Sequence, residues 1–171
     1  MNEPDPQSIE EAFARPDGSE WRDAADQEIQ QQYRNGTFSE LMELPKGKKA
    51  IDTKWVLKIE RGPDNEIDRY KGRVAARGFM QEFGLDYYET HTGVVRSTCI
   101  RVILALVAFY DLEIIQLDFI SAYLNSDLEE EVHVRQPPGY IKTGKEYLVY
   151  RVLKVLYGLK QSARAWNKRA S

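Results

Sequence analysis

Apolar residues recur at helical spacing in several stretches of the chain. A helix is predicted from Ser19, taken as its N-cap, to Asn35, because Gly36 can supply a left-handed stop. A second helix is predicted from residue 97 or 98 to about residue 110, and it is apolar on nearly all sides. Such a helix is expected to be buried. A third, basic helix is predicted from residue 161 to about residue 170.

Alternating apolar and polar residues predict the strands. Short strands are expected at 37–44, 132–135 and 148–153. The strongest β pattern is a long hairpin formed by residues 50–59 and 69–79, which a turn rich in glycine, proline and asparagine connects.

Basic residues recur along both strands of this predicted hairpin. Lys54 and Lys58 alternate with apolar residues on the first strand, and Lys71, Arg73 and Arg77 punctuate the second. A ribbon with one cationic face can bind a nucleic-acid backbone or a triphosphate, because Lys and Arg contact phosphate oxygens. The same lysines can instead protect an edge strand from aggregation. The pattern alone leaves both interpretations open.

One aspartate ends an apolar run in the middle of the chain. Residues 112–117 have the composition of a buried strand, and Asp118 follows them directly. Aspartate is depleted in strands and is costly to bury unless it is paired or bound to a metal, so such a strand typically places it in a crevice. Asp118 can equally N-cap a short helix that begins at Phe119.

Charge is sorted along the chain more strongly than its total of −3 suggests. Residues 1–44 carry a net charge of −8, residues 45–79 carry +5, residues 80–131 carry −8, and residues 132–171 carry +8. Two basic segments therefore flank the acidic segment that contains Asp118. This arrangement is expected if phosphates are led toward a carboxylate–metal centre, although solvated surface faces would produce it too.

Several other kinds of site are disfavoured by the composition. Cys99 is the single cysteine, so no internal disulfide can form, and this suits an intracellular protein. His91 and His133 have no second His or Cys at ligand spacing, which favours a structural role for both. The longest apolar run is far shorter than the roughly 20 residues of a membrane span, and the acidic N-terminus is unlike a signal peptide. We therefore expect no membrane partner.

Five motifs occur in order along the chain. They are LPKGKKAIDTKWVLKIE, DRYKGRVAARGFMQEFGLDYYET, IRVILALV, QLDFISAYLNSDLEEEVHVRQPPGY and KVLYGLKQSARAW. Their order and spacing resemble the N-terminal portion of a copia-type retrotransposon reverse transcriptase, an RNA-dependent DNA polymerase. The likeness covers roughly Trp21 to Lys168. No single motif is decisive, but the five together argue strongly against chance similarity.

The resemblance implies an α+β fold, namely the fingers and an incomplete palm of a right-hand polymerase. In such a fold a β-hairpin and helices pack on a small antiparallel sheet. Residues 1–18 would form a loosely ordered lead-in, and residues 19–171 a fragment of the reverse transcriptase domain. The fingers would span about 37–95 and the partial palm about 97–171.

The resemblance also assigns roles to individual residues. Asp118 matches the first catalytic aspartate of the palm and would ligate Mg²⁺ or Mn²⁺, with help from the backbone carbonyl of Phe119. Divalent cations with oxygen ligands bridge the attacking 3′-oxygen and the triphosphate in this type of chemistry. Tyr123 matches an aromatic gate beneath the sugar, which would exclude a 2′-hydroxyl by collision and so select deoxynucleotides.

Four more residues are expected to bind substrate. Lys71 and Arg73 fall where the family's fingers contact the triphosphate, and the resemblance does not fix which of them aligns. Gly158 and Gln161 lie in the family's nucleotide- and template-contacting turn. The implied partners are an RNA or DNA template-primer and deoxynucleoside triphosphates, in the cytoplasm or in retroelement particles.

The sequence also departs from the family pattern. The Tyr-x-Asp-Asp motif, which supplies the other palm carboxylates, does not occur in it. Gly93, Ile120 and Ser162-Ala163 replace the usual proline, lysine and Ala-Pro. We therefore expect a truncated or drifting element copy, or a fragmentary gene model, that is inactive by itself although the intact parent extends primers. The alternatives are a non-catalytic remnant that binds nucleic acid weakly through its basic segments, and an acidic structural or protein-interaction module.

Overall fold

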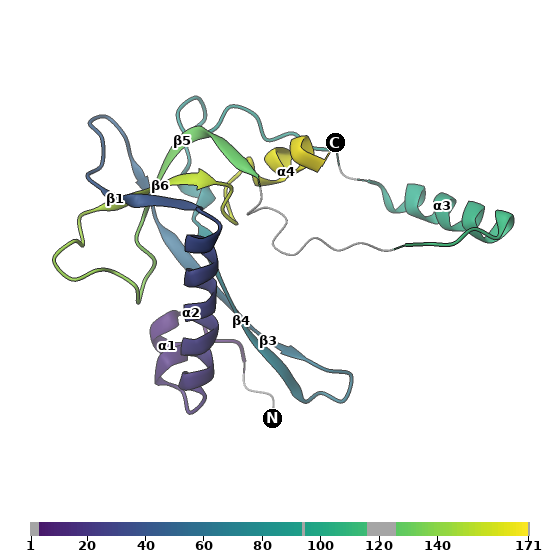
Figure 1. The fold of residues 1–171 in the computed structure, drawn as a ribbon, viewed down its shortest axis with the longest axis horizontal. Helices are drawn as coiled ribbons and strands as arrows, with labels where there is room; N and C mark the ends of the chain where they lie inside the picture. The colour runs from purple at the N-terminus through teal and green to yellow at the C-terminus, as the bar shows by residue number, and fades with distance from the viewer. Residues whose placement is uncertain (1–3, 94, 116–125, 171) are drawn as a thin grey trace.

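The computed structural model describes residues 4–93, 95–115 and 126–170 (Figure 1). Within these residues the chain is an α+β protein whose strands form a four-stranded sheet and a separate two-stranded hairpin. The helices are α1 (Ile9–Ala14), α2 (Gly18–Arg34), α3 (Ser97–Tyr110) and α4 (Ser162–Ala170), with a 3-10 turn at Gly78–Met80. The strands are β1 (Phe38–Met42), β2 (Ala50–Ile51), β3 (Thr53–Arg61), β4 (Ile67–Ala76), β5 (Asp127–Arg135) and β6 (Val149–Lys154).

The four-stranded sheet has the order β1-β6-β5-β2. β6 pairs antiparallel with both β1 and β5, whereas β2 runs parallel to β5. The sheet is therefore mixed, and the expectation of a purely antiparallel sheet was wrong. The three short strands predicted from alternation are confirmed, and all three lie in this sheet. The strand predicted at 132–135 begins earlier than expected, at Asp127.

The predicted hairpin is confirmed as β3 and β4, which pair from Thr53↔Ala76 to Arg61↔Ile67. Its first two expected residues, Ala50 and Ile51, belong instead to the four-stranded sheet as β2. Only Asp52 separates β2 from β3, so the chain passes from the sheet into the hairpin without a loop. This direct passage ties the base of the hairpin to the sheet.

Helix α2 lies against β4 and covers one face of the hairpin (Figure 1). Trp21 and Ala25 are fully buried, and the Trp21 ring meets the Tyr70 ring edge-on at 4.9 Å between centroids. The predicted helix is confirmed, including its end before Gly36, which has a φ of +65°. The predicted N-cap was wrong, because Asp17 holds that position and Ser19 lies in the first turn.

Residues 1–18 were expected to be a loosely ordered lead-in, and residues 9–14 form α1 instead. Ile9 and Ala12 are buried in the core. Ser8 Oγ accepts a hydrogen bond from Glu11 N at 3.1 Å, and the Glu11 carboxylate accepts one from Gln7 N at 2.8 Å. The sequence Ser-x-x-Glu is that of a capping box, although the Glu11 carboxylate here bonds to the amide before the N-cap residue and not to the amide of Ser8. This local signal outweighs the polar composition around it.

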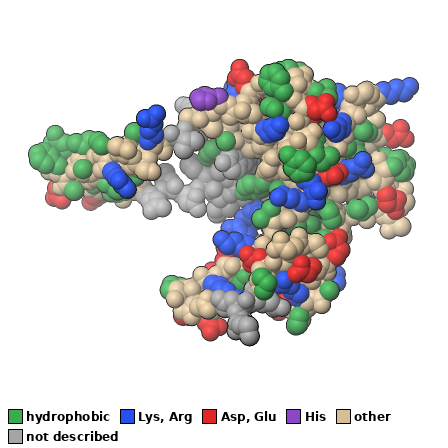
Figure 2. All heavy atoms as spheres, turned by 180° about the vertical axis from the view of Figure 1, so that it is seen from behind, with side chains coloured by type: hydrophobic (Ala, Val, Ile, Leu, Met, Phe, Trp, Pro, Cys, Tyr) green, Lys and Arg blue, Asp and Glu red, His purple; other side chains and the backbone are tan. Residues whose placement is uncertain are grey.

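Helix α3 has the predicted bounds, but the prediction that it is buried was wrong. No residue of α3 is buried, and Phe109 is 79% exposed. The helix stands apart from the sheet in Figure 1 and forms a largely hydrophobic arm in Figure 2. A helix that is apolar on all sides is expected to be buried, but its sequence does not indicate which surface would bury it.

The strand predicted at 112–117 is also not supported where it can be checked. Residues 112–115 are not in a strand, and Leu112, Ile114 and Ile115 are exposed. Residues 116 and 117 lie outside the described residues. Across the described part of the chain, no helix has both the length and the apolarity needed to cross a membrane.

Two alanine substitutions test this division between core and arm. Trp21→Ala should lower the free energy of unfolding by about 3–5 kcal/mol, because it empties a buried site. Phe109→Ala should change it by less than about 0.5 kcal/mol, because most of that ring already contacts solvent. Chemical denaturation of both variants measures the difference. A large loss for Phe109→Ala would show that α3 is covered.

Candidate functional site

Five basic residues share one face of the β3–β4 hairpin. The cross-strand pairs on this face include Lys58↔Lys71, Val56↔Arg73 and Glu60↔Arg69. Side chains alternate between the two faces of a strand, so this face lies opposite the buried face formed by Trp55, Leu57 and Ile59. We call Lys54, Lys58, Arg69, Lys71 and Arg73 the cationic face.

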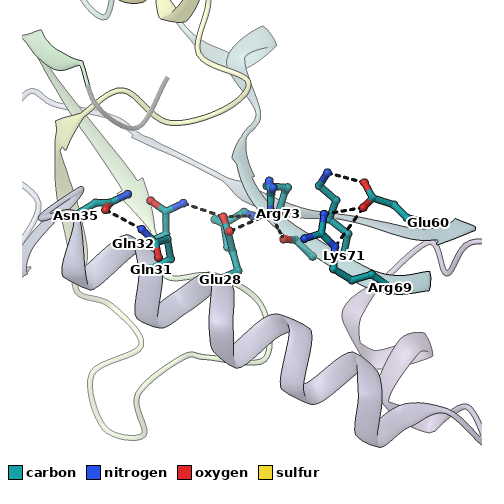
Figure 3. A network of polar contacts seen from close by, with 10 residues as sticks. Glu28, Gln31, Gln32, Asn35, Glu60, Arg69, Lys71 and Arg73 are labelled. Carbon is teal, nitrogen blue, oxygen red and sulfur yellow. Dashed lines mark hydrogen bonds and ion pairs between the residues drawn. The ribbon is translucent and has the colours of Figure 1, made fainter. Parts of the chain in front are cut away.

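Two members of the cationic face share one carboxylate. Lys71 Nζ lies 2.6 Å from one oxygen of Glu60, and Arg69 Nη2 lies 2.7 Å from the other (Figure 3). The hydrogen bond from Lys71, followed by that from Arg69, lowers the pKa of Glu60 to about 2. Two positive charges thus face one negative charge at neutral pH, and a positive charge remains for an anionic ligand.

Arg73 is paired with a carboxylate from another element. Its Nη1 atom lies 3.5 Å from Glu28 Oε2 of α2 and donates a hydrogen bond to the Gly72 carbonyl at 3.2 Å (Figure 3). The guanidinium carbon lies 5.9 Å from the centroid of the Tyr157 ring. Arg73 therefore connects the hairpin, helix α2 and the turn that follows β6.

A groove runs between α2 and β4, with a volume of about 200 Å³. Arg69, Lys71 and Arg73 line it from the strand, and Gln27, Glu28 and Gln31 line it from the helix. The structure thus brings the two predicted triphosphate contacts, Lys71 and Arg73, into one groove. Lysine, arginine and amide side chains all carry donors that suit phosphate oxygens.

Gly158 lies where the turn after β6 presses against the end of β4. Ala76 N donates a hydrogen bond to the Tyr157 carbonyl at 2.7 Å. Gly158 has a φ of +84°, and a Cβ atom there would lie 2.2 Å from the Ala76 carbonyl oxygen. A Cβ atom on Gly78 would in turn lie 2.0 Å from the Gly158 oxygen. Both glycines are required by this close backbone contact.

Gln161 is buried, and its side chain is used within the protein. It accepts a hydrogen bond from Gln81 Nε2 at 3.0 Å and donates one to the Asp86 carbonyl at 3.0 Å. Gln81 also accepts a hydrogen bond from Lys160 N at 2.7 Å. These amides fasten the turn to residues 81–86. Sequence reasoning missed Gln81, because a single glutamine in a loop gives no signal that it is buried.

The remaining predicted site residues cannot be placed. Asp118, Phe119 and Tyr123 lie outside the described residues, so their roles stay predictions. Among the residues that are described, no group of three or more His, Cys, Asp or Glu side chains could hold a metal ion. His133 is buried, and its burial lowers its pKa, so the side chain is neutral within the core. Cys99 is exposed.

Comparison with known proteins identifies the family. Residues 35–171 match the family model described as reverse transcriptase (RNA-dependent DNA polymerase). The chain belongs to this reverse transcriptase family. The predicted resemblance to copia-type elements is confirmed by retrotransposon relatives. No solved structure matches the chain.

Three of the relatives are retrovirus-related Pol polyproteins of plant transposons. The chain is 42% identical over 162 residues to that of transposon TNT 1-94 from Nicotiana tabacum, which covers 95% of this chain and 12% of the relative. It is 37% identical over 146 residues to those of RE1 and RE2 from Arabidopsis thaliana, covering 85% of this chain and 10% of each relative. The chain thus spans about a tenth of the length of these proteins. Helices α1 and α2 precede the matched reverse transcriptase region.

A glycine pair tests the close contact in this reverse transcriptase chain. Gly158 and Gly84 have the same φ of +84°, but a Cβ atom on Gly84 would meet nothing within 4 Å. Gly84→Ala should therefore cost only the conformational term of about 1–2 kcal/mol. Gly158→Ala should cost about 3 kcal/mol or more, because the clash with Ala76 adds to that term. Equal losses in urea denaturation would show that the turn does not press on β4.

The ion pairs of Glu60 give a pH-dependent test. Its pKa is lowered from 4.5 to about 2, so the pairing stabilises the folded reverse transcriptase chain above pH 4.5 and is lost as the pH falls toward 2. The Glu60 carboxyl signal in an NMR titration should follow that value. Lys71→Ala should raise the pKa more than Arg69→Ala, since Lys71 has the larger effect. A titration that neither substitution moves would contradict these pairings.

Proposed function

We propose that this chain forms the fingers and the first part of the palm of an RNA-directed DNA polymerase. In the intact parent protein, this polymerase would add deoxynucleotides to a primer paired with an RNA or DNA template. The fingers would span about 37–95, with α1 and α2 as their support, and the partial palm about 97–171. The family match over residues 35–171 is the basis of the proposal.

One structural observation supports it most directly. Two segments that the family resemblance connects with substrate, namely Lys71–Arg73 and the Gly158–Gln161 turn, lie far apart in sequence. In the fold they adjoin, because Ala76 N bonds to the Tyr157 carbonyl and Arg73 lies near the Tyr157 ring. A nucleotide held by one segment would therefore be within reach of the other.

The cationic face would bind the triphosphate. Lys71 supplies a mobile point charge, whereas Arg73 presents several N–H donors in a plane. Before the nucleotide arrives, Lys71 is paired with the Glu60 carboxylate and Arg73 with the Glu28 carboxylate. Tyr123 would then exclude a 2′-hydroxyl and favour deoxynucleotides.

Asp118 and the carbonyl oxygen of Phe119 would hold Mg²⁺ or Mn²⁺. A divalent cation at these oxygens would supply Lewis-acid stabilisation of charge on the transferred phosphoryl group. The other palm carboxylates of the family lie in a Tyr-x-Asp-Asp motif that is absent from this sequence. A test of activity must therefore supply that motif.

A chimera that continues this chain with the palm-completing region of the tobacco relative provides the test. Primer extension by the chimera should be abolished by Asp118→Asn, because the substitution removes a metal ligand. Tyr123→Val should raise ribonucleotide incorporation relative to deoxynucleotides by roughly tenfold or more, because it removes a steric clash. Tyr147→Val changes an exposed tyrosine of the described fold and should leave the ratio unchanged.

Two results would count against the proposal. Extension that survives Asp118→Asn would refute the assignment of the catalytic carboxylate. A chimera that fails to extend primers, although it folds and the matching tobacco region is active, would favour a non-catalytic remnant.

A further inference from the structure

We propose that Glu28 of α2 is a positioning residue that orients Arg73 for nucleotide binding in the groove between α2 and β4. The inference rests on the proposed function, since it takes Arg73 as a contact of the triphosphate. Helix α2 precedes the region that matches the reverse transcriptase family, and neither a motif nor the comparisons assign Glu28 a role.

Glu28 is fixed in place by neutral partners. Its side chain is only 4% exposed, although a buried carboxylate is costly unless it is paired and hydrogen-bonded. Its Oε1 atom accepts hydrogen bonds from Val74 N at 3.2 Å and from Gln32 Nε2 at 2.8 Å. These bonds would persist when a ligand enters the groove, so the carboxylate provides a rigid anchor.

The other oxygen of Glu28 faces Arg73. This Oε2 atom lies 3.5 Å from Arg73 Nη1, and the arginine side chain keeps 33% exposure (Figure 3). A guanidinium has five N–H donors, so contacts with Glu28 and the Gly72 carbonyl leave donors available for a phosphate. Arg73 is therefore held at one end and open to ligand at the other.

Glu60 differs from Glu28 in this respect. Its carboxylate is bound only by Lys71 and Arg69 among the contacts described, and its side chain is 29% exposed. The Glu60 carboxylate can rotate into solvent, which leaves Lys71 and Arg69 available to bind a phosphate. Glu28 cannot rotate away without breaking the bond to the β4 backbone. The groove thus combines Lys71, whose carboxylate partner can move into solvent, with Arg73, whose carboxylate partner is fixed.

The direction in which Glu28→Gln changes triphosphate affinity distinguishes a positioning role from simple charge repulsion. Glu28→Gln keeps an acceptor for Val74 N and Gln32 but removes the charge that holds Arg73. If Glu28 only repelled the phosphates, this change would strengthen triphosphate binding. If it orients Arg73, the change should weaken binding about three- to tenfold, because the long side chain must be ordered again when the ligand binds.

The experiment measures dTTP binding to the full 171-residue chain by NMR titration in EDTA, so that metal ligands do not contribute. Arg73→Ala and Glu28→Gln should each weaken binding, and Glu28→Gln should have no further effect when Arg73 is already alanine. A purely structural role of Glu28 would weaken binding in both backgrounds. Glu20→Gln is the matched control, because it makes the same chemical change at an exposed carboxylate of α2 that bonds to Ser19 and does not line the groove, and binding should stay unchanged.

Each outcome decides between specific claims. Unchanged or tighter binding by Glu28→Gln, with Arg73→Ala still weakened, overturns the positioning role and leaves the proposed function intact. Unchanged binding by both Lys71→Ala and Arg73→Ala overturns the assumed phosphate contacts themselves. The unsubstituted chain gives an independent measurement if Glu28→Gln fails to fold. An ordered Arg73 Nε–Hε signal in NMR relaxation is expected, and a freely mobile one would overturn the proposal.

Discussion

The fold of this chain depends on how the β3–β4 hairpin is held at its edges. A two-stranded ribbon is marginal by itself and presents unpaired backbone groups along both edges. Here three backbone amides on the edges of the hairpin donate hydrogen bonds to three other segments. Ile59 N donates to Asp5, Val74 N to Glu28, and Ala76 N to the Tyr157 carbonyl. The N-terminal segment, α2 and the turn after β6 are thus all fastened to the same ribbon. The face of the hairpin opposite Trp55, Leu57 and Ile59 remains available for the basic residues.

This edge capping explains why the candidate site forms where it does. Covering the apolar face with Trp21 and other α2 residues forces the alternate residues of both strands outward, and these include Lys71 and Arg73. The bond from Ala76 brings the Gly158 turn to the end of β4, and the Gln81–Gln161 pair fixes it there. Segments that are distant in sequence become neighbours through backbone contacts that only glycine permits at positions 78 and 158.

Much of this architecture could be predicted from the sequence, since alternation and turn chemistry are local signals. They located β1, β5, β6, the hairpin and α2, and the spacing of motifs identified the reverse transcriptase family. The errors concern what local patterns leave open. The apolar sequence of α3 predicted burial but did not indicate which surface would bury it. The polar composition around α1 led to the prediction of a loosely ordered segment, although the Ser8–Glu11 capping signal was present. The buried pairing of Gln81 with Gln161, and of Glu28 with Val74, depends on tertiary contacts that no single segment encodes.

Hydrogen exchange of the unsubstituted chain tests the capping of the hairpin most directly. The amides of Ile59, Val74 and Ala76 bond outside the β3–β4 ladder, so the hydrogen bonds that protect them from exchange are those to Asp5, Glu28 and Tyr157. The account predicts that all three amides exchange as slowly as amides within the ladder, and that those of the exposed helix α3 exchange much faster. Fast exchange at Val74 and Ala76, comparable to that of α3, would contradict it.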